Sequence, residues 1–383
     1  MNTIRSIFSI LSVLMILGVS VAFADLVSNF NKGALALQQG KHSEAVKWFR
    51  KAADQGYAAA QHILGEIYTK GMGVLKDDAE AVKWFRKAAD QGFLPAQYNL
   101  GFMYSDGIGV IKDDAEALKW YRLAAEQGYA DAQYNVGVMY RTGDGVIKDY
   151  AEAVKWYRKA ADQGEAGAQY SLGLMYARGD GVTKNSNEAL KWYRKAADQG
   201  YATAMLNLGF MYANGNGVIK DDAEAVKWYR KAADQGEAAA QYNLGIRYAN
   251  GFSLYKDDAE AVKWYRKAAD QGFAPAQYNL GLMYANGNGV IKDDAEAVRW
   301  YRKAAYQGHA DAQTHLGLMY ATGRGVLRQN ILAHMWWNIA ATNGAEESAN
   351  NKGLIEKKMI ASDIAWANQK AKLCLKSNYK ICD

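Results

Sequence analysis

Tryptophan recurs at a constant interval of 36 residues along most of this chain. The nine residues in register are Trp48, Trp84, Trp120, Trp156, Trp192, Trp228, Trp264, Trp300 and Trp336. A glycine keeps the same interval at Gly92, Gly128, Gly164, Gly200, Gly236, Gly272, Gly308 and Gly344. A period of this length is the mark of a stacked repeat architecture. An ordinary chain of 383 residues would form two or three domains. The repeat instead predicts one linear array whose length reflects the number of repeats.

The period divides the chain into four parts. Residues 1–24 form an export signal, and residues 25–56 form a shorter leading repeat. Eight full repeats occupy residues 57–344, and residues 345–383 form a tail that departs from the pattern.

Each repeat carries the pattern of two helices. In the repeat 201–236, Ala225, Trp228, Tyr229 and Ala232 lie on one helical stripe. Asp221 is the expected N-cap of this second helix, and Gly236 suits the left-handed position that follows a helix. The first helix places Ala204, Leu208, Met211 and Tyr212 on its packed face and ends at Asn214-Gly215-Asn216-Gly217. A helix hairpin cannot bury its apolar face alone, so neighbouring repeats must stack.

Composition agrees with a helical chain in which glycine ends the helices. The hydrophobic share of 50% excludes intrinsic disorder. The two prolines, Pro95 and Pro275, hold equivalent places at the first turn of a first helix, where a missing N–H is harmless. Two cysteines exclude a disulfide-dense scaffold and a zinc site of four thiolates.

A glycine also recurs inside every first helix, where it is unfavourable by about 1 kcal/mol relative to alanine. The series is Gly65, Gly101, Gly137, Gly173, Gly209, Gly245, Gly281 and Gly317. We expect these glycines to permit a close approach of two helices, with small alanines on the facing helix.

The repeated pattern reads A-x-Y-x-L-G-x-x-Y-x-x-G-x-G-V, then D-x-x-E-A-x-x-W-Y-x-x-A-A-x-x-G. One repeat carries it as Ala132, Tyr134, Val136, Gly137, Tyr140, Gly143, Gly145, Val146, Glu152, Ala153, Trp156, Tyr157, Ala160, Ala161 and Gly164. This resembles the Sel1-like repeat, a relative of the tetratricopeptide repeat, over residues 57–344. The leading repeat has a shorter turn that is similar to the tetratricopeptide form. The resemblance implies an all-α, right-handed α-solenoid with a protein-binding or scaffold role, and no enzyme activity.

The first 24 residues have the features of a secretory signal peptide. Arg5 precedes an apolar stretch, and Ala22-Phe23-Ala24 matches the cleavage pattern, so the mature chain is expected to begin at Asp25. An uncleaved anchor is the alternative, although the apolar stretch is short for a spanning helix. We expect a periplasmic or secreted protein with no stable membrane insertion after cleavage.

The tail resembles the ends of other exported members of the family. Residues 345–358 are predicted to form one helix, and Ser362 to cap a second helix that reaches about Lys376. These helices would cover the last apolar face, as the end of a solenoid requires. Cys374 and Cys382 are the only cysteines, and in an oxidising compartment we expect a disulfide between them; two free thiols are the alternative.

The first helices also carry apolar residues on a second side. In the tetratricopeptide relatives the equivalent positions line the concave face and contact ligand peptides. The candidate partner-binding residues are Tyr98, Phe102, Tyr134, Arg141, Tyr170, Arg178, Phe210, Asn214, Tyr242, Asn250, Tyr278 and Asn286. Packing between neighbouring first helices explains the regular tyrosines equally well. The sixth full repeat departs most, with Arg247 in place of methionine and Phe252-Ser253-Leu254 in place of x-Gly-Val. A local site, a bend and a tolerated loop variant all remain open for it.

Charge and motifs exclude several other functions. Each Lys-Trp-Tyr-Arg-Lys run is matched by acidic residues at the start of the same helix, which favours a solvated helix face over nucleic-acid binding. Two S-x-x-K matches begin at Ser253 and Ser377, but S-D-N and K-T-G are absent, and the histidines show no metalloprotease spacing. We therefore predict no catalytic residues, no metal and no cofactor.

These observations favour an exported, monomeric scaffold that binds a protein or peptide, as an envelope regulator or host-interaction factor. A cell-wall-directed enzyme of the penicillin-binding or β-lactamase type is one alternative, and a purely structural spacer is another.

Overall fold

The computed structural model describes residues 21–252 and 255–382, and these residues form helices without any strand. The predicted signal peptide lies almost entirely outside them, as do Ser253 and Leu254. The chain divides into two compact units, Met1–Trp192 and Tyr193–Asp383, with the boundary inside α11. None of the helices in the described ranges has the length and apolarity needed to cross a membrane.

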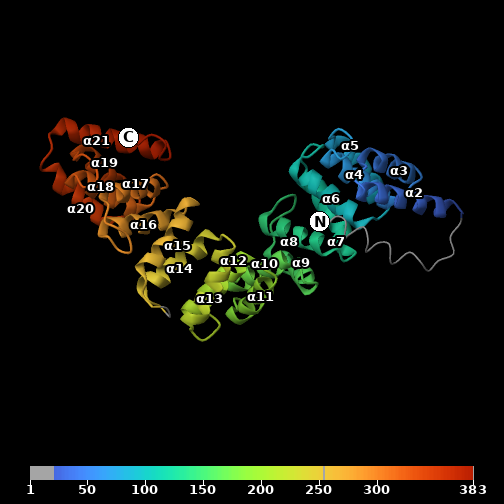
Figure 1. Ribbon diagram of the computed structural model, residues 1–383, viewed down its shortest axis with the longest axis horizontal. Coiled ribbons are helices and arrows are strands. Elements are labelled where there is room, and N and C mark those ends of the chain that lie inside the picture. Colours follow the sequence, from blue (N-terminus) through green and yellow to red (C-terminus); the bar gives the residue numbers. More distant parts are fainter. Residues whose placement is uncertain (1–20, 253–254, 383) are drawn as a thin grey trace. The chain divides into compact units, whose positions relative to one another are not determined.

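The helices follow one another as antiparallel pairs (Figure 1). In the first compact unit they are α2 (Val21–Gln38), α3 (His42–Asp54), α4 (Ala58–Lys70), α5 (Asp78–Ala89), α6 (Leu94–Asp106), α7 (Asp114–Glu126), α8 (Ala130–Thr142), α9 (Tyr150–Asp162), α10 (Ala166–Arg178) and α11 (Ser186–Asp198). In the second they are α12 (Ala202–Asn214), α13 (Asp222–Asp234), α14 (Ala238–Asn250), α15 (Asp258–Asp270), α16 (Ala274–Asn286), α17 (Asp294–Ala305), α18 (Ala310–Thr322), α19 (Asn330–Thr342), α20 (Glu346–Glu356) and α21 (Ala361–Lys376). From α4 to α19, even numbers are first helices and odd numbers are second helices.

The predicted helix ends are confirmed. The Asp221 carboxylate accepts from the backbone N–H of Glu224 at 2.9 Å, so it caps α13. At the other end, Gly236 has φ of 93°. Its N–H donates to the Ala233 carbonyl and the N–H of Glu237 to the Ala232 carbonyl, which is the hydrogen-bond pattern of a Schellman motif. Both prolines lie in the first turns of α6 and α16.

The hydrophobic core is built between consecutive repeats. One cluster combines Leu118 and Tyr121 of α7 with Val136 and Met139 of α8, and Trp156 of α9 closes it. The same arrangement recurs at α5 to α7 and at α15 to α17. Trp84, Trp120, Trp156, Trp192 and Trp300 each complete a core that starts in the preceding repeat, which explains their fixed interval.

The two turn glycines have different roles. Gly143 has φ of 90° and ends α8 in the left-handed conformation. A Cβ on Gly145 would lie 2.3 Å from the Asp114 carbonyl oxygen, at the start of the preceding second helix. The second glycine is thus a contact between repeats rather than part of a phosphate-binding loop.

The expectation for the glycines inside the first helices is wrong in one respect. A close approach does occur, but the facing group is an aromatic ring instead of alanine. A Cβ on Gly137 would lie 2.7 Å from the ring of Tyr157, and on Gly209 it would lie 2.5 Å from the ring of Tyr229. In each pair the ring stands 20 residues after the glycine and lies against its bare backbone.

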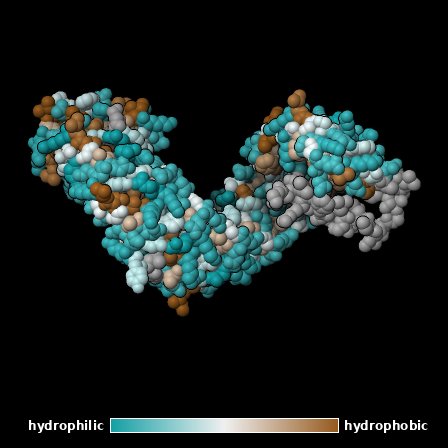
Figure 2. Space-filling view, in the orientation of Figure 1, coloured by the Kyte–Doolittle hydropathy of each residue, from teal (hydrophilic) through white to brown (hydrophobic). Residues whose placement is uncertain are grey.

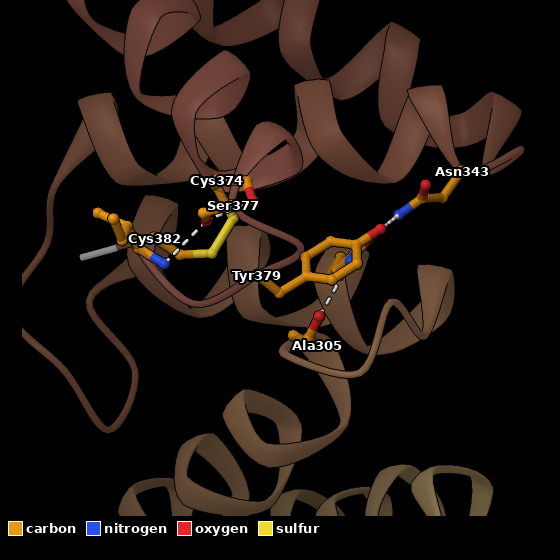
Figure 3. The surroundings of a disulfide bond; sticks show 8 residues. Ala305, Asn343, Cys374, Ser377, Tyr379 and Cys382 are labelled. Carbon is orange, nitrogen blue, oxygen red and sulfur yellow. Dashed lines mark hydrogen bonds between the residues drawn. A yellow bond between two sulfur atoms is a disulfide. The ribbon is translucent and has the colours of Figure 1, made fainter. Parts of the chain in front are cut away.

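The tail closes the array as predicted, with one correction. The helices α20 and α21 both pack on α19. Ser362 does not cap the last helix, because α21 begins at Ala361 with Ile360 as N-cap and has no side-chain cap. Cys374 and Cys382 form the predicted disulfide, which bonds the end of α21 to the C-terminal segment (Figure 3). Beside it, the Tyr379 hydroxyl accepts from the Asn343 side-chain amide at 2.8 Å and so ties the tail to the end of α19.

Candidate partner-binding face

The tyrosines predicted to bind a partner lie half-buried at contacts between repeats. The Tyr98 ring centroid lies 5.7 Å from that of Tyr121 in the same repeat and 5.5 Å from that of Tyr129, which precedes α8. Tyr242 contacts Tyr265 and Phe273 in the same manner. The structure therefore gives these rings a packing role and leaves one side of each accessible.

Polar side chains of the next first helix act on these tyrosines. Asn135 partly offsets the rise in the pKa of Tyr98 and Tyr121 that burial causes, and Asn279 does the same for Tyr242 and Tyr265. On α10, Ser171 stands in place of the asparagine and acts in the same way on Tyr134.

Burial keeps several phenols of this row neutral at physiological pH. Burial raises the pKa of Tyr98, and it raises the pKa values of Tyr129 and Tyr278 to about 12. The row therefore offers apolar area and neutral hydrogen-bonding groups to a partner.

Within the first helices, more accessible apolar residues lie one helical turn further along than these tyrosines. Phe102 is 44% exposed, and Phe210 and Leu318 are each 41% exposed. The Phe210 ring meets Tyr229 edge-on at 5.8 Å, so one part of it packs while the rest faces solvent. Tyr170 is half-buried on α10.

The residues predicted to rim this face behave in two ways. Arg178, Asn214, Asn250 and Asn286 are exposed at the last position of their helices. The Asn214 and Asn250 amides donate to the carbonyls four residues earlier, so they also finish their own helices. Arg141 stands one position before this series, and its Nε donates to the Tyr157 hydroxyl at 3.1 Å. It therefore belongs to the packed layer and not to the rim.

In the sixth full repeat, Arg247, which stands where other repeats have methionine, forms an ion pair. Arg247 lies 2.6 Å from Asp222 at the start of α13, and its guanidinium stands 5.1 Å from the centre of the Phe252 ring. Methionine at the equivalent positions is buried instead, as at Met211 and Met283. Arg247 thus fastens neighbouring repeats of the second compact unit through charge.

Sequence reasoning missed a series of exposed aliphatic residues in the loops between the two helices of a repeat. Ile111, Ile147, Ile219 and Ile291 are each about 90% exposed, and a lysine follows each of them. Each of these isoleucines lies between the turn glycines and the N-cap aspartate, so it belongs to neither helix face. An apolar residue outside both helix faces could have been identified from the sequence as exposed. Figure 2 shows separated hydrophobic patches on a mostly hydrophilic surface.

The two S-x-x-K serines and the metal-ligand residue types can be placed in the structure only in part. Ser253 lies outside the described residues. The Ser377 hydroxyl donates to the Cys374 carbonyl and accepts from the Ile381 N–H, so it stabilises the turn beside the disulfide (Figure 3). Within residues 21–252 and 255–382, no three His, Cys, Asp or Glu side chains meet in a way that would hold a metal ion.

Comparison with known proteins decides the family. The Sel1 repeat matches the chain nine times, over residues 32–57, 58–93, 94–129, 130–165, 166–201, 202–237, 238–273, 274–309 and 310–344. The chain belongs to the Sel1 repeat family. Sel1 repeat proteins generally act as scaffolds for protein–protein interaction, and their solenoid fold is typically non-enzymatic.

Two solved structures extend this assignment. A protective antigen present in uropathogenic Escherichia coli strains, which displays an SLR fold, is 34% identical; the match covers 92% of this chain and 93% of that one, with a TM-score of 0.53. A Sel1 repeat protein from Oxalobacter formigenes is 37% identical over 63% of this chain and 96% of that one, with a TM-score of 0.57. No curated protein matches the chain.

Proposed function

We propose that this Sel1 repeat protein is an exported scaffold that binds a protein or peptide on the face formed by its first helices. The observation that carries the proposal is the half-exposed aromatic residues that the first helices present within each compact unit, with Phe102 as the most accessible first-helix ring of the first unit and Phe210 as that of the second. Aromatic residues with neutral polar neighbours are typical of protein-binding surfaces.

Export to the periplasm or the cell exterior is part of the proposal. The predicted signal peptide and the disulfide at Cys374 and Cys382 both suit an oxidising compartment. Cell fractionation tests this, and N-terminal sequencing of the exported form should begin at Asp25.

Partner binding is tested with substitutions that leave the packed layer intact. The test protein is a double variant that combines Phe102→Glu with Arg178→Glu. Both residues are exposed on first helices, so the fold should persist. The matched control is Leu123→Glu on α7, where the leucine is 38% exposed on a second helix.

The measurement is cross-linking in cells followed by affinity capture and mass spectrometry. We expect a partner that the control retains and the double variant loses. A partner list identical for all three proteins would contradict binding on this face and would favour a spacer.

A further inference from the structure

The last second helix, α19, begins without the acidic residues that start the others. The repeats before it read Lys-Asp-Asp-Ala-Glu or a close variant, whereas this one reads Arg328-Gln329-Asn330-Ile331-Leu332. In four repeats the lysine pairs with the second aspartate at 3.2 to 3.6 Å, as in Lys112–Asp114. Arg328 has the neutral Asn330 in that place.

The helix cap is missing as well. In α7 the Asp113 carboxylate accepts from the backbone N–H groups of Ala115 and Glu116, each at 3.0 Å. At α19 the N-cap is Gln329, and no side chain accepts from the first turn. The positive end of this helix thus lacks the carboxylate that an aspartate supplies at α5, α7, α9, α13, α15 and α17.

A cavity of about 570 Å³ lies at this helix end, lined mainly by residues of α19 and α21 of the second compact unit. Its walls carry three cations, Arg302, Arg328 and Lys370, against one carboxylate, Asp363. Trp366, which is 52% exposed, forms part of the lining, and Lys370 Nζ lies 5.3 Å from the centre of its ring. The volume is within the range of ligand pockets.

Trp366 distinguishes among anionic ligands. A peptide can place an apolar side chain on the exposed indole ring, whereas an inorganic anion has no apolar group.

We propose that this pocket binds an acidic peptide segment of a partner protein. The ligand carboxylate replaces the absent aspartate cap by accepting from the first turn of α19 and from Arg328. A neighbouring apolar side chain of the peptide packs on Trp366. The site is separate from the first-helix face and does not depend on the function proposed for that face.

Fluorescence anisotropy of the mature, disulfide-bonded protein tests the proposal. The probe is a fluorescein-labelled peptide Glu-Phe-Asp-Leu-Glu, compared with its uncharged counterpart Gln-Phe-Asn-Leu-Gln. We expect the acidic peptide to bind about ten-fold tighter or more, because each charge-assisted hydrogen bond is worth more than a neutral one.

The decisive variant is Gln329→Asp combined with Asn330→Asp, which restores the residues of the other repeats. It should lower the affinity for the acidic peptide about ten-fold or more while the melting temperature stays equal or rises, since the helix regains its cap. Lys292→Glu, at the position equivalent to Arg328 in the preceding repeat, is the charge control and should leave binding unchanged.

Three results would overturn the proposal. These are equal affinity for both peptides, undiminished binding by the double aspartate variant, and complete competition by an equal concentration of inorganic phosphate, which would indicate an anion site without peptide recognition. Phe102→Glu should not alter binding of the acidic peptide, so failure of the first-helix proposal and failure of this one are distinguishable.

Discussion

At the scale of single residues, the pairing of a helix-interior glycine with an aromatic ring is the contact that every repeat reuses. The ring of Tyr157 lies over Gly137, and the rings of Tyr229 and Trp337 lie over Gly209 and Gly317. This contact joins the two helices of one repeat. Because the glycine of the first helix has no side chain, the ring of the second helix can lie against the glycine backbone. The unfavourable helix propensity of glycine is thereby offset by burial of the ring.

Gly137→Ala should destabilise the protein by about 1–2 kcal/mol. The added methyl group overpacks the ring of Tyr157, and better helix propensity recovers only part of the loss. Gly353→Ala on α20 is the control, since an added Cβ there meets nothing within 4 Å, and it should raise stability slightly. Urea unfolding of both variants measures the difference; an equal gain for both would contradict the role of the ring contact.

His62 makes the N-terminal repeats sensitive to acid. It occupies the place of Tyr98 in its repeat, and burial together with the charge of Lys70 lowers its pKa to about 4, below the usual 6.5. Because the folded state resists protonation, stability is complete above pH 6.5 and falls as the pH drops from there towards 4.

We expect α4 to lose about 2 kcal/mol of local stability between pH 7 and pH 5. Hydrogen exchange of α4, corrected for the intrinsic pH dependence of exchange, measures this loss. His62→Tyr, which installs the residue of the other repeats, should abolish it. A pH dependence that survives this substitution would assign the effect to another group.

At the scale of the helix, aspartate caps mark where most second helices begin. Aspartates at 77, 113, 149, 221, 257 and 293 all accept from the first turn of their second helices. A buried glutamine in most first helices continues the pattern: the Gln133 amide donates to the Ala125 carbonyl near the end of α7, and its oxygen accepts from Gln163. Backbone carbonyl groups that lack a partner at the end of one helix thus accept hydrogen bonds from the glutamine side chain of the next repeat.

Removal of one cap should have a measurable local effect. Asp221→Ala should cost about 1 kcal/mol, because the first turn of α13 loses its acceptor. The control Gln329→Ala should cost close to nothing, since Gln329 provides no cap. Hydrogen exchange in the first turns of α13 and α19 compares the two, and equal losses would refute this account of the caps.

At the scale of the whole molecule, stability is distributed over contacts between neighbouring repeats. Each core cluster involves only consecutive helices, and the tail helices cover the final one. Such arrays behave as a sum of repeat and interface terms. We therefore expect the protein to tolerate deletion of one whole repeat but not deletion of half a repeat.

Deletion of residues 130–165 removes one complete repeat and should leave a folded protein. The seam joins Tyr129 to Ala166 in the original register, so α7 meets α10 as it met α8. We expect unchanged helical content per residue by circular dichroism and a urea m-value lower by about a tenth. Deletion of residues 148–165, which removes α9 alone, should expose the face of α8 and cause aggregation. Equal behaviour of the two deletions would contradict the nearest-neighbour picture.

The elements could be predicted from the sequence because their determinants are local. Apolar spacing, aspartate caps and terminal glycines act within a few residues of each other, so helix positions, the 36-residue step and the position of the prolines follow directly. The disulfide was also predictable, since Cys374 has Cys382 as its sole possible partner within the chain. Boundaries were less certain: Ser362 has the chemistry of a cap, yet α21 begins before it.

The tertiary structure alone decided which side chains meet. It placed Tyr157 over Gly137, where alanine was expected, and it turned Arg141 into the packed layer. It also showed that loss of the acidic start of α19 coincides with a basic cavity beside Trp366. The physical reason is distance along the chain: local pattern specifies each helix, but the neighbours of a side chain are set by how helices 20 or more residues apart stack.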